Sequence, residues 1–254
     1  MVYDLQKASL WKRIAAWLFD AIVAGTLAVG LAFLLSGLLG YDGYSQTINE
    51  AYARYEREYG VVFDISQEAY QALDAAQQRN YDAAYNALAS DADAMHAYDM
   101  MVNLTMVITS LGILLAVVVW ELLIPLLLKN GQTLGKKIFG LCLVRTDGVA
   151  MNNMQLFTRT VLGKFAVETM IPVYIMIMIF WGGMGIGGTM ILFVLLIAEI
   201  ACVAMSRTNG AIHDLLAGTA VVDLSSQMIF RSTEDLIAYK KQVAAERAAR
   251  DPYR

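Results

Sequence analysis

Four long apolar stretches constrain what this 254-residue chain can fold into more than any other feature. A helix crosses a bilayer with about 20 predominantly apolar residues. Within lipid, a segment satisfies its backbone hydrogen bonds only as a helix or as part of a closed barrel. The stretches occupy residues 14–38, 102–128, 160–181 and 184–205. The sequence therefore predicts an all-α membrane protein with a four-transmembrane-helix bundle.

The overall composition agrees with this class. Hydrophobic residues form 58% of the chain and charged residues 17%, whereas soluble proteins average roughly 45–50% and about 25%. The two cysteines, Cys142 and Cys202, lie too far apart in the sequence to indicate a disulfide framework or a zinc site. We expect neither a metal nor another cofactor.

The distribution of charge predicts the side of the membrane on which each loop lies. Residues 41–99 hold eleven acidic residues against three arginines, and the other lysines and arginines are concentrated near the termini and in or beside 129–159. An excess of Lys and Arg marks cytoplasmic loops. We therefore expect a multi-pass protein of the cell membrane, with both termini and 129–159 in the cytoplasm and 41–99 outside.

These assignments divide the chain into six segments. They are 1–40 (N-terminus and first span), 41–99 (extracytoplasmic helical insert), 100–128 (second span), 129–159 (cytoplasmic loop), 160–206 (hairpin of the third and fourth spans) and 207–254 (cytoplasmic C-terminal segment). From about residue 233 the chain is rich in Ala, Lys and Arg, which predicts a helix in solvent or on the membrane surface.

The insert 41–99 carries tyrosines at helical spacing, which predicts two amphipathic helices broken near residues 60–64. Two interpretations follow. The insert packs on itself as a helical hairpin, or it forms a docking surface for a partner protein or a second copy, since tyrosine is enriched at interfaces.

The loop 129–159 predicts a small cytoplasmic β-hairpin. Residues 138–145 favour a strand, Asp147-Gly148 marks a turn, and 149–151 supply the returning strand. A further short strand at 219–223 is expected to join it.

Four carboxylates lie inside the predicted spans, and each is seven to nine residues from the cytoplasmic end of its helix. They are Asp20, Glu121, Glu168 and Glu199. At 1.5 Å per residue, all four lie about 10–14 Å into the membrane. Arg13, Arg159 and Lys164 are the counter-charges expected to tune them. Ionisable groups at this depth face a partner or a wet cavity.

The spacing of these groups predicts some of their contacts. Lys164 and Glu168 are four residues apart, the separation of a direct helical pair. Arg13 leans toward the N-terminus of its helix, away from Asp20, so Asp20 is expected to contact another helix.

Two of the acids share a proline pattern, since Glu121 precedes Pro125 by four residues and Glu168 precedes Pro172 by four. A proline frees the carbonyl four residues earlier, and bent helices with free carbonyls and acids hold Na⁺ or H⁺ in many transporters. The alternative is that the kinks are ordinary and the acids hold the bundle together.

Three sequence stretches resemble the RDD family of membrane proteins. They run from Arg13 to Asp20, from Gly131 to Gly140, and from Asn209 to Thr219. The family is named for one arginine and two aspartates, and the resemblance assigns these to Arg13, Asp20 and Asp214. The matching loop residues are Gly131, Gln132, Thr133, Gly135 and Lys136. The resemblance implies the fold and a role in transport, including cation/proton exchange in some members. The insert 41–99 is longer than the family's short first loop.

Two features of the motifs have their own physical interpretation. The Gly-rich stretch 131–137 either binds an anion or lipid phosphates through lysine and backbone N–H groups, or simply lies along the membrane surface. Asp214 is hypothesised to pair with Arg13 or Arg159 at the base of the bundle.

These observations favour a transporter coupled to protons or monovalent cations, with Asp20, Glu121, Glu168 and Glu199 as the ion or proton site. Because four spans make a thin unit, we expect a homo-oligomer. The alternative is a non-catalytic scaffold or accessory subunit that docks a partner through 41–99. A membrane enzyme acting on lipid is disfavoured, because no nucleophile or metal motif is recognisable, and no basic and aromatic pattern indicates nucleic-acid binding.

Overall fold

The computed structural model describes residues 4–128 and 131–250, so the ends of the predicted segments at 1–3, 129–130 and 251–254 lie outside the described residues. The described residues contain four helices long and apolar enough to cross a membrane. These spans are Leu10–Leu38, Ala92–Leu128, Asn153–Phe180 and Gly185–Met205. The fold class predicted from the sequence is confirmed: this is a helical, multi-pass membrane protein with a small sheet.

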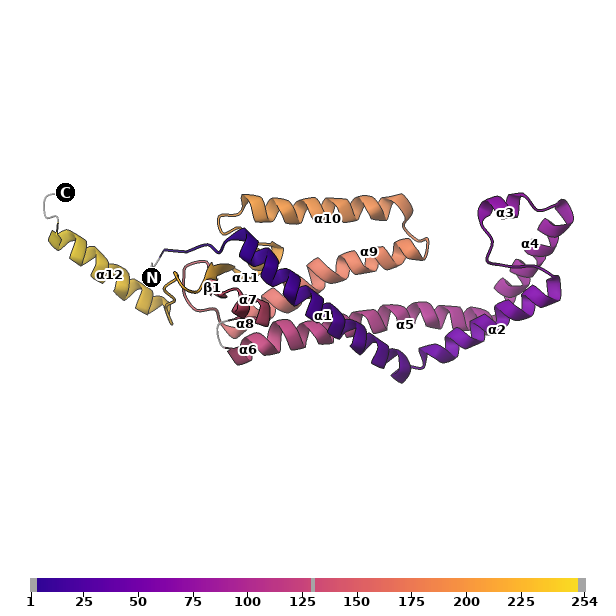
Figure 1. The fold of residues 1–254 in the computed structure, drawn as a ribbon, viewed down its shortest axis with the longest axis horizontal. Coiled ribbons are helices and arrows are strands. Elements are labelled where there is room, and N and C mark those ends of the chain that lie inside the picture. The colour runs from indigo at the N-terminus through magenta and orange to yellow at the C-terminus, as the bar shows by residue number, and fades with distance from the viewer. Residues whose placement is uncertain (1–3, 129–130, 251–254) are drawn as a thin grey trace. The chain divides into compact units, whose positions relative to one another are not determined.

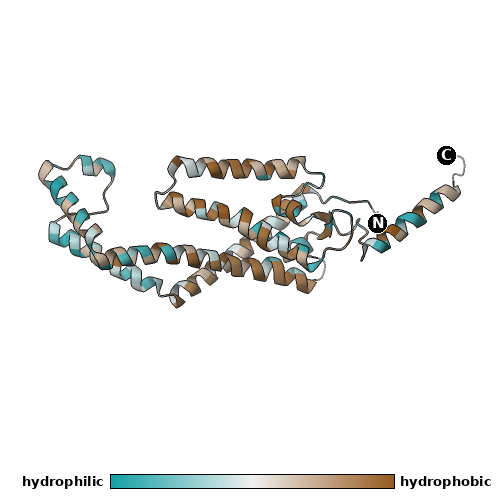
Figure 2. Ribbon diagram, turned by 180° about the vertical axis from the view of Figure 1, so that it is seen from behind, coloured by the Kyte–Doolittle hydropathy of each residue, from teal (hydrophilic) through white to brown (hydrophobic). Residues whose placement is uncertain are grey.

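The α-helices of the spans are labelled in Figure 1. The first is α1 (Leu10–Leu38). The second is α5 (Ala92–Val117), η1 (Val118–Leu123) and α6 (Ile124–Leu128), and the third is α8 (Asn153–Phe157), η2 (Thr158–Met170) and α9 (Ile171–Phe180). The fourth is α10 (Gly185–Met205). Figure 2 shows α9 and α10 as predominantly apolar helices.

Two of the spans contain π-helical segments, η1 and η2, and each ends shortly before a proline. Pro125 and Pro172 have no N–H to donate, and their rings displace the carbonyl one turn earlier. A wider turn with i→i+5 bonding absorbs this displacement without breaking the helix. The proline pattern thus marks where both helices depart from α geometry.

The chain divides into two compact units, residues 30–112 and the rest. In the first, α2 (Tyr41–Tyr59), α3 (Gln67–Gln71) and α4 (Ala75–Ser90) form the insert. Gly60 ends α2 with a φ of 64°, a left-handed conformation that glycine adopts without steric cost. The predicted break near 60–64 is therefore present.

The insert has a core of its own. Its buried residues include Ile48, Ala51 and Leu88. The ring of Phe63 lies 5.4 Å from Tyr52 and 5.8 Å from Tyr81, both edge to face, a favoured aromatic geometry. The insert thus packs on itself, as the first of the two interpretations expected.

The second unit holds a two-stranded antiparallel sheet of β1 (Leu141–Arg145) and β2 (Thr219–Asp223), in which Leu143 pairs with Val221. The partner of β1 is thus the strand expected at 219–223. The return after the turn is a single bridge, Val144 with Ala150. The sheet is a core element, because Cys142, Val144 and Val222 are fully buried.

Three short or terminal helices complete this unit: α7 (Leu134–Ile138), α11 (Ile212–Ala217) and α12 (Thr233–Arg250). Thr133 caps α7 by accepting a hydrogen bond from the Lys136 N–H, which satisfies one of the free donors at a helix start. Gly218 ends α11 with a φ of 63°, so the chain turns directly into β2. The chain therefore runs from the loop motif through α7 into β1, and from the last family stretch through α11 into β2.

Candidate functional site

Asp20 is a buried acceptor for several donors. The indole Nε1 of Trp120 donates to Oδ1 at 3.0 Å, and the Gly135 N–H donates to the same atom at 3.0 Å. The Thr133 hydroxyl donates to Oδ2 at 2.5 Å. Asp20 therefore contacts other elements, as predicted, and holds α7 against α1.

Glu121 is buried between two lysines. Its Oε1 lies 2.6 Å from Lys164 Nζ and its Oε2 lies 3.8 Å from Lys136 Nζ. The same Lys136 Nζ lies 3.8 Å from Asp20 Oδ2. We call Asp20, Glu121, Lys136 and Lys164 the lysine group. In it, two carboxylates share two ammonium groups, so the burial of each charge is offset by an opposite one.

The backbone of Glu121 also finds a partner. The Thr160 hydroxyl donates to the Glu121 carbonyl at 3.1 Å. This is the carbonyl that Pro125 frees, so a side chain from the third span replaces the missing backbone donor. The freed carbonyl joins the second and third spans.

Lys164 pairs with Glu121 and not with Glu168, against the prediction from their spacing. Each residue instead has a partner on another element. Lys164 Nζ lies 2.6 Å from Glu121 Oε1 on the second span, and Glu168 Oε2 lies 2.6 Å from His213 Nδ1 on α11.

Asp214 pairs with two arginines, as hypothesised. Its Oδ1 lies 3.0 Å from Arg159 Nε, and its Oδ2 lies 3.6 Å from Arg13 Nη2. We call Arg13, Arg159 and Asp214 the arginine group. Burial raises the pKa of Asp214, but the charges of Arg159 and Arg13 and the hydrogen bond from Arg159 lower it by more, so the net pKa lies below its ordinary value. The carboxylate is therefore ionised.

His213 lies between this arginine group and Glu168. Its Nδ1 is 2.6 Å from Glu168 Oε2, and its Nε2 is 2.8 Å from Arg159 Nη2. Guanidinium only donates hydrogen bonds, so Nε2 accepts and Nδ1 carries the proton that is donated to Glu168. Burial and then the charge of Arg159 lower the pKa of His213, which agrees with a neutral imidazole.

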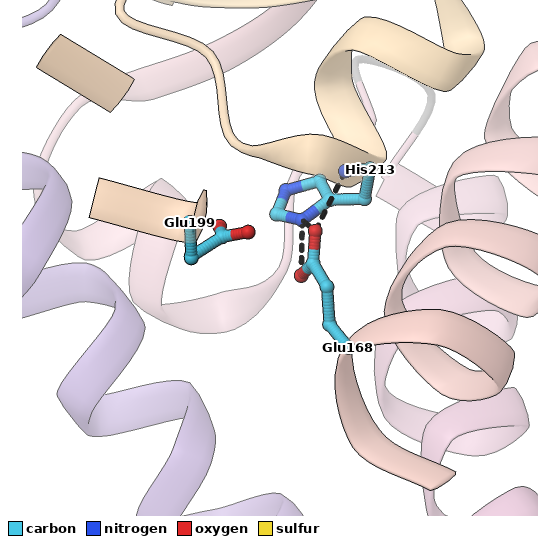
Figure 3. Close-up of side chains that lie close together, drawn as sticks. All are labelled: Glu168, Glu199 and His213. Atoms are coloured by element: carbon cyan, nitrogen blue, oxygen red, sulfur yellow. Dashed lines mark hydrogen bonds and ion pairs between the residues drawn. The ribbon is translucent and has the colours of Figure 1, made fainter. Parts of the chain in front are cut away.

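Glu199 approaches the same imidazole from α10. One ligand atom from each of Glu168, Glu199 and His213 lies within 4.8 Å of the other two. Figure 3 shows the Glu199 carboxylate aimed at the ring and Glu168 below it. Among the described residues, two buried side-chain atoms have no hydrogen-bond partner, Oε2 of Glu199 and Oε2 of Glu121. We call Glu168, Glu199 and His213 the histidine group.

The structure thus divides the four predicted acids into two sets. Asp20 and Glu121 meet through Lys136, and Glu168 and Glu199 meet at His213. In the described part of the chain, neither Glu168 nor Glu199 lies within 4.0 Å of a lysine or arginine nitrogen. The second set is therefore a pair of carboxylates whose close titratable neighbour is a histidine.

Several residues of these groups were not predicted as partners. Trp120 and His213 become recognisable only when distant helices meet. Lys136 was expected either to bind an anion or lipid phosphate or to lie along the membrane surface, but its side chain is buried beside two acids. Burial lowers the pKa of Lys136 to about 8, against the opposing charge of Glu121. The loop motif therefore contributes side-chain and backbone groups to the interior of the second unit, because Thr133 and Gly135 also donate hydrogen bonds to Asp20.

Comparison with known proteins identifies the family. The sequence model of the RDD family matches residues 7–218. The chain belongs to the RDD family. No curated protein and no solved structure matches it, so the activity of this RDD protein is argued from its own residues.

The three residues assigned to the family's name lie at two contacts of the structure. Asp20 anchors the loop helix α7 through Gly135. Asp214 joins Arg13 on α1 to Arg159 on the third span. In this RDD protein the motif residues therefore tie together spans and loops that are far apart in sequence.

Proposed function

We propose that this RDD protein is a cation- or proton-coupled transporter whose exchange site is the histidine group of Glu168, Glu199 and His213. The observation that carries the proposal is Oε2 of Glu199, which lies buried near His213 with neither a hydrogen bond nor an ion pair among the described residues. Oε2 of Glu121 also lacks a hydrogen bond, but it lies 3.8 Å from Lys136 Nζ. Placing an ionisable group inside a membrane helix costs a few kcal/mol of free energy. Such groups therefore usually face a partner or line an ion pathway.

The contacts of the four acids support two different roles for them. Glu121 bonds to Lys164 at 2.6 Å and Asp20 accepts three hydrogen bonds. A carboxylate that is already neutralised gains little from a further cation or proton, so we assign Asp20 and Glu121 a structural role. Glu168 and Glu199 lack such cations among the described residues, and two carboxylates that share a site favour the uptake of positive charge.

The local helix geometry supports a site that binds and releases a cation or proton. Glu168 lies in the π-helical segment η2, and π-helical turns are frequent at functional sites. At Gly163, an added Cβ would lie 2.5 Å from the Cβ of His213. Because only glycine allows this approach, the imidazole reaches the carboxylates of the third and fourth spans.

The proposal also covers the membrane location of the protein and its oligomeric state. The charge distribution favours a cell membrane protein with both termini in the cytoplasm, and the transported species are protons or monovalent cations. Many large apolar side chains of the spans are exposed, among them Phe33, Phe180 and Met205. In a membrane these face lipid or other copies of the chain, which supports a homo-oligomer.

The test is ion flux in proteoliposomes that contain the full-length protein and a pH-sensitive dye. Proton movement is recorded under imposed Na⁺, K⁺ and pH gradients for wild type, Glu199→Gln and the control Glu246→Gln. Glu246 is exposed on α12, so its substitution removes one acid without touching the histidine group.

We expect coupled flux in wild type and in Glu246→Gln, and none in Glu199→Gln at equal reconstitution. Two results would contradict the proposal. One is wild-type flux no higher than that of empty liposomes under every gradient, and the other is full flux in Glu199→Gln.

A second candidate function is a scaffold that docks a partner through 41–99. The observation that favours it is the exposure of two insert tyrosines, Tyr52 at 40% and Tyr85 at 59%, although the insert has a core of its own. Crosslinking in native membranes tests it: a stoichiometric partner lost on Tyr85→Ser, with the insert still folded, would favour the scaffold. An absence of crosslinked protein would count against it.

A further inference from the structure

The histidine group has the donor set of a transition-metal site. It offers an imidazole nitrogen and carboxylate oxygens from three elements, with the ligand atoms within 4.8 Å of one another. Alkali and alkaline-earth ions take oxygen ligands, whereas imidazole together with carboxylate suits zinc and its neighbours. Figure 3 shows the three side chains converging from different parts of the fold.

We propose that Glu168, Glu199 and His213 bind a divalent transition-metal ion, with Zn²⁺ as the best-fitting member of the class. That this ion is also transported rests on the proposed function, whereas its binding does not.

The spacing of the ligand atoms fits such an ion. Bonds from zinc to nitrogen or oxygen are about 2.1 Å, so two ligand atoms on a tetrahedral ion lie about 3.4 Å apart. His213 Nδ1 lies 2.6 Å from Glu168 Oε2, and the separations within the group reach at most 4.8 Å. The required spacing falls inside this range, so small side-chain rotations suffice.

The contacts of Glu199 and His213 are compatible with metal binding. Glu199 Oε2 is buried without a hydrogen-bond partner among the described residues. At His213, metal binding through Nδ1 requires the imidazole proton to move from Nδ1 to Nε2, where Asp214 Oδ2 lies 3.6 Å away as an acceptor. Three protein ligands leave a fourth position open, unlike structural zinc sites, in which the protein supplies all four ligands.

The positive charge nearest the site is held elsewhere. Arg159 Nη2 lies 2.8 Å from His213 Nε2, but the same arginine is paired with Asp214 at 3.0 Å. With the proton on Nε2, Asp214 is the carboxylate that orients the imidazole, as acidic partners of metal-bound histidines do. Arg159 Nη2 then has to turn away from Nε2, while Arg159 Nε keeps its pair with Asp214. The metal ion binds on the Nδ1 side, where the two glutamates lie.

The binding test needs no membrane gradient. Purified full-length protein in detergent is stripped with a chelator and titrated with Zn²⁺ by calorimetry, and with Co²⁺ by visible absorption, which reports nitrogen and oxygen ligands directly. The variants are Glu199→Gln and the control Glu246→Gln. Glu199→Gln removes a ligand that makes no ion pair in the described part of the chain, so the fold stays intact.

We expect one Zn²⁺ per chain in wild type and Glu246→Gln, a tetrahedral Co²⁺ spectrum, and affinity reduced at least about tenfold in Glu199→Gln. Wild type that does not bind Zn²⁺ or Co²⁺, or equal affinity in Glu199→Gln, would overturn the site. Binding without flux would overturn the transporter alone, and proton or Na⁺ flux without metal binding would overturn the metal site alone.

Discussion

The lysine group and the histidine group differ in what neutralises their carboxylates. In the lysine group, Glu121 lies 2.6 Å from one ammonium and 3.8 Å from a second. In the histidine group, Glu168 bonds to an imidazole, and Glu199 keeps a buried oxygen without a partner among the described residues. Oε2 of Glu121 also lacks a hydrogen-bond partner, but it faces the ammonium group of Lys136, whereas Oε2 of Glu199 forms no ion pair in the described part of the chain.

This difference teaches that depth in the membrane does not define function. All four acids were predicted at a similar distance from the helix ends, yet their surroundings differ. A buried carboxylate with a lysine is a stable contact whose loss is costly. A carboxylate beside a neutral histidine can gain or lose a cation at little cost to the fold. The predictions below test this division.

The largest effect is expected at the arginine group. Asp214→Asn leaves Arg13 and Arg159 buried without their carboxylate, and breaking a buried pair costs about 3–5 kcal/mol. Asp214 is fully buried, with Arg159 2% exposed. We expect loss of monodisperse protein in size-exclusion chromatography after extraction. The control is Asp147→Asn at the exposed Arg145 pair, and a wild-type melting temperature for Asp214→Asn would refute the account.

Two glycine substitutions sharpen the comparison between the groups. A Cβ at Gly135 would lie 2.8 Å from Asp20 Oδ1, and one at Gly163 would lie 2.5 Å from the Cβ of His213. Forcing a methyl group into such a site costs about 1–3 kcal/mol, so both alanine variants should melt earlier than wild type. A Cβ at Gly187 meets no atom within 4 Å, which makes Gly187→Ala the control.

The two glycine variants should differ in flux. Gly163→Ala displaces His213 from the carboxylates and should abolish flux per folded protein, whereas Gly135→Ala should leave it near wild type. Equal flux in both folded variants would remove the functional division between the groups.

Much of this fold was predictable because its signals are local. Apolar length located the spans, and the prolines at 125 and 172 marked the two irregular helices. The contacts were less predictable because they join residues far apart. The predicted Lys164–Glu168 pair is replaced by contacts with Glu121 and His213 on other elements, and Trp120 is a partner of Asp20 across 100 residues. His213 lacks metal-ligand spacing, since its companions come from other helices.

A smaller stability effect is expected for Glu199→Gln. The substitution keeps the shape of the side chain and breaks no ion pair in the described part of the chain, so unfolding should change by less than about 1 kcal/mol. Thermal unfolding in detergent measures this. A loss as large as that of Asp214→Asn would mean that Glu199 is structural.

The smallest effect is expected at the exposed pair of Lys12 and Asp223, 2.6 Å apart. Hydrogen bonds from Lys12 and Ser225 lower the pKa of Asp223 to about 2. The carboxylate therefore contributes stability above its ordinary pKa of 3.8 and loses it as the pH falls toward about 2. Asp223→Asn should cost about 0.5 kcal/mol at pH 7, with a difference that shrinks at pH 3. A difference that grows on acidification would contradict the assignment.

The central claim is that the histidine group, and not the lysine group, exchanges ions. Its most direct test is proton flux through Glu199→Gln in proteoliposomes, with the melting temperature recorded on the same preparation. We predict a wild-type melting temperature and no flux above empty liposomes, while wild type transports. Wild-type flux in folded Glu199→Gln would contradict the claim.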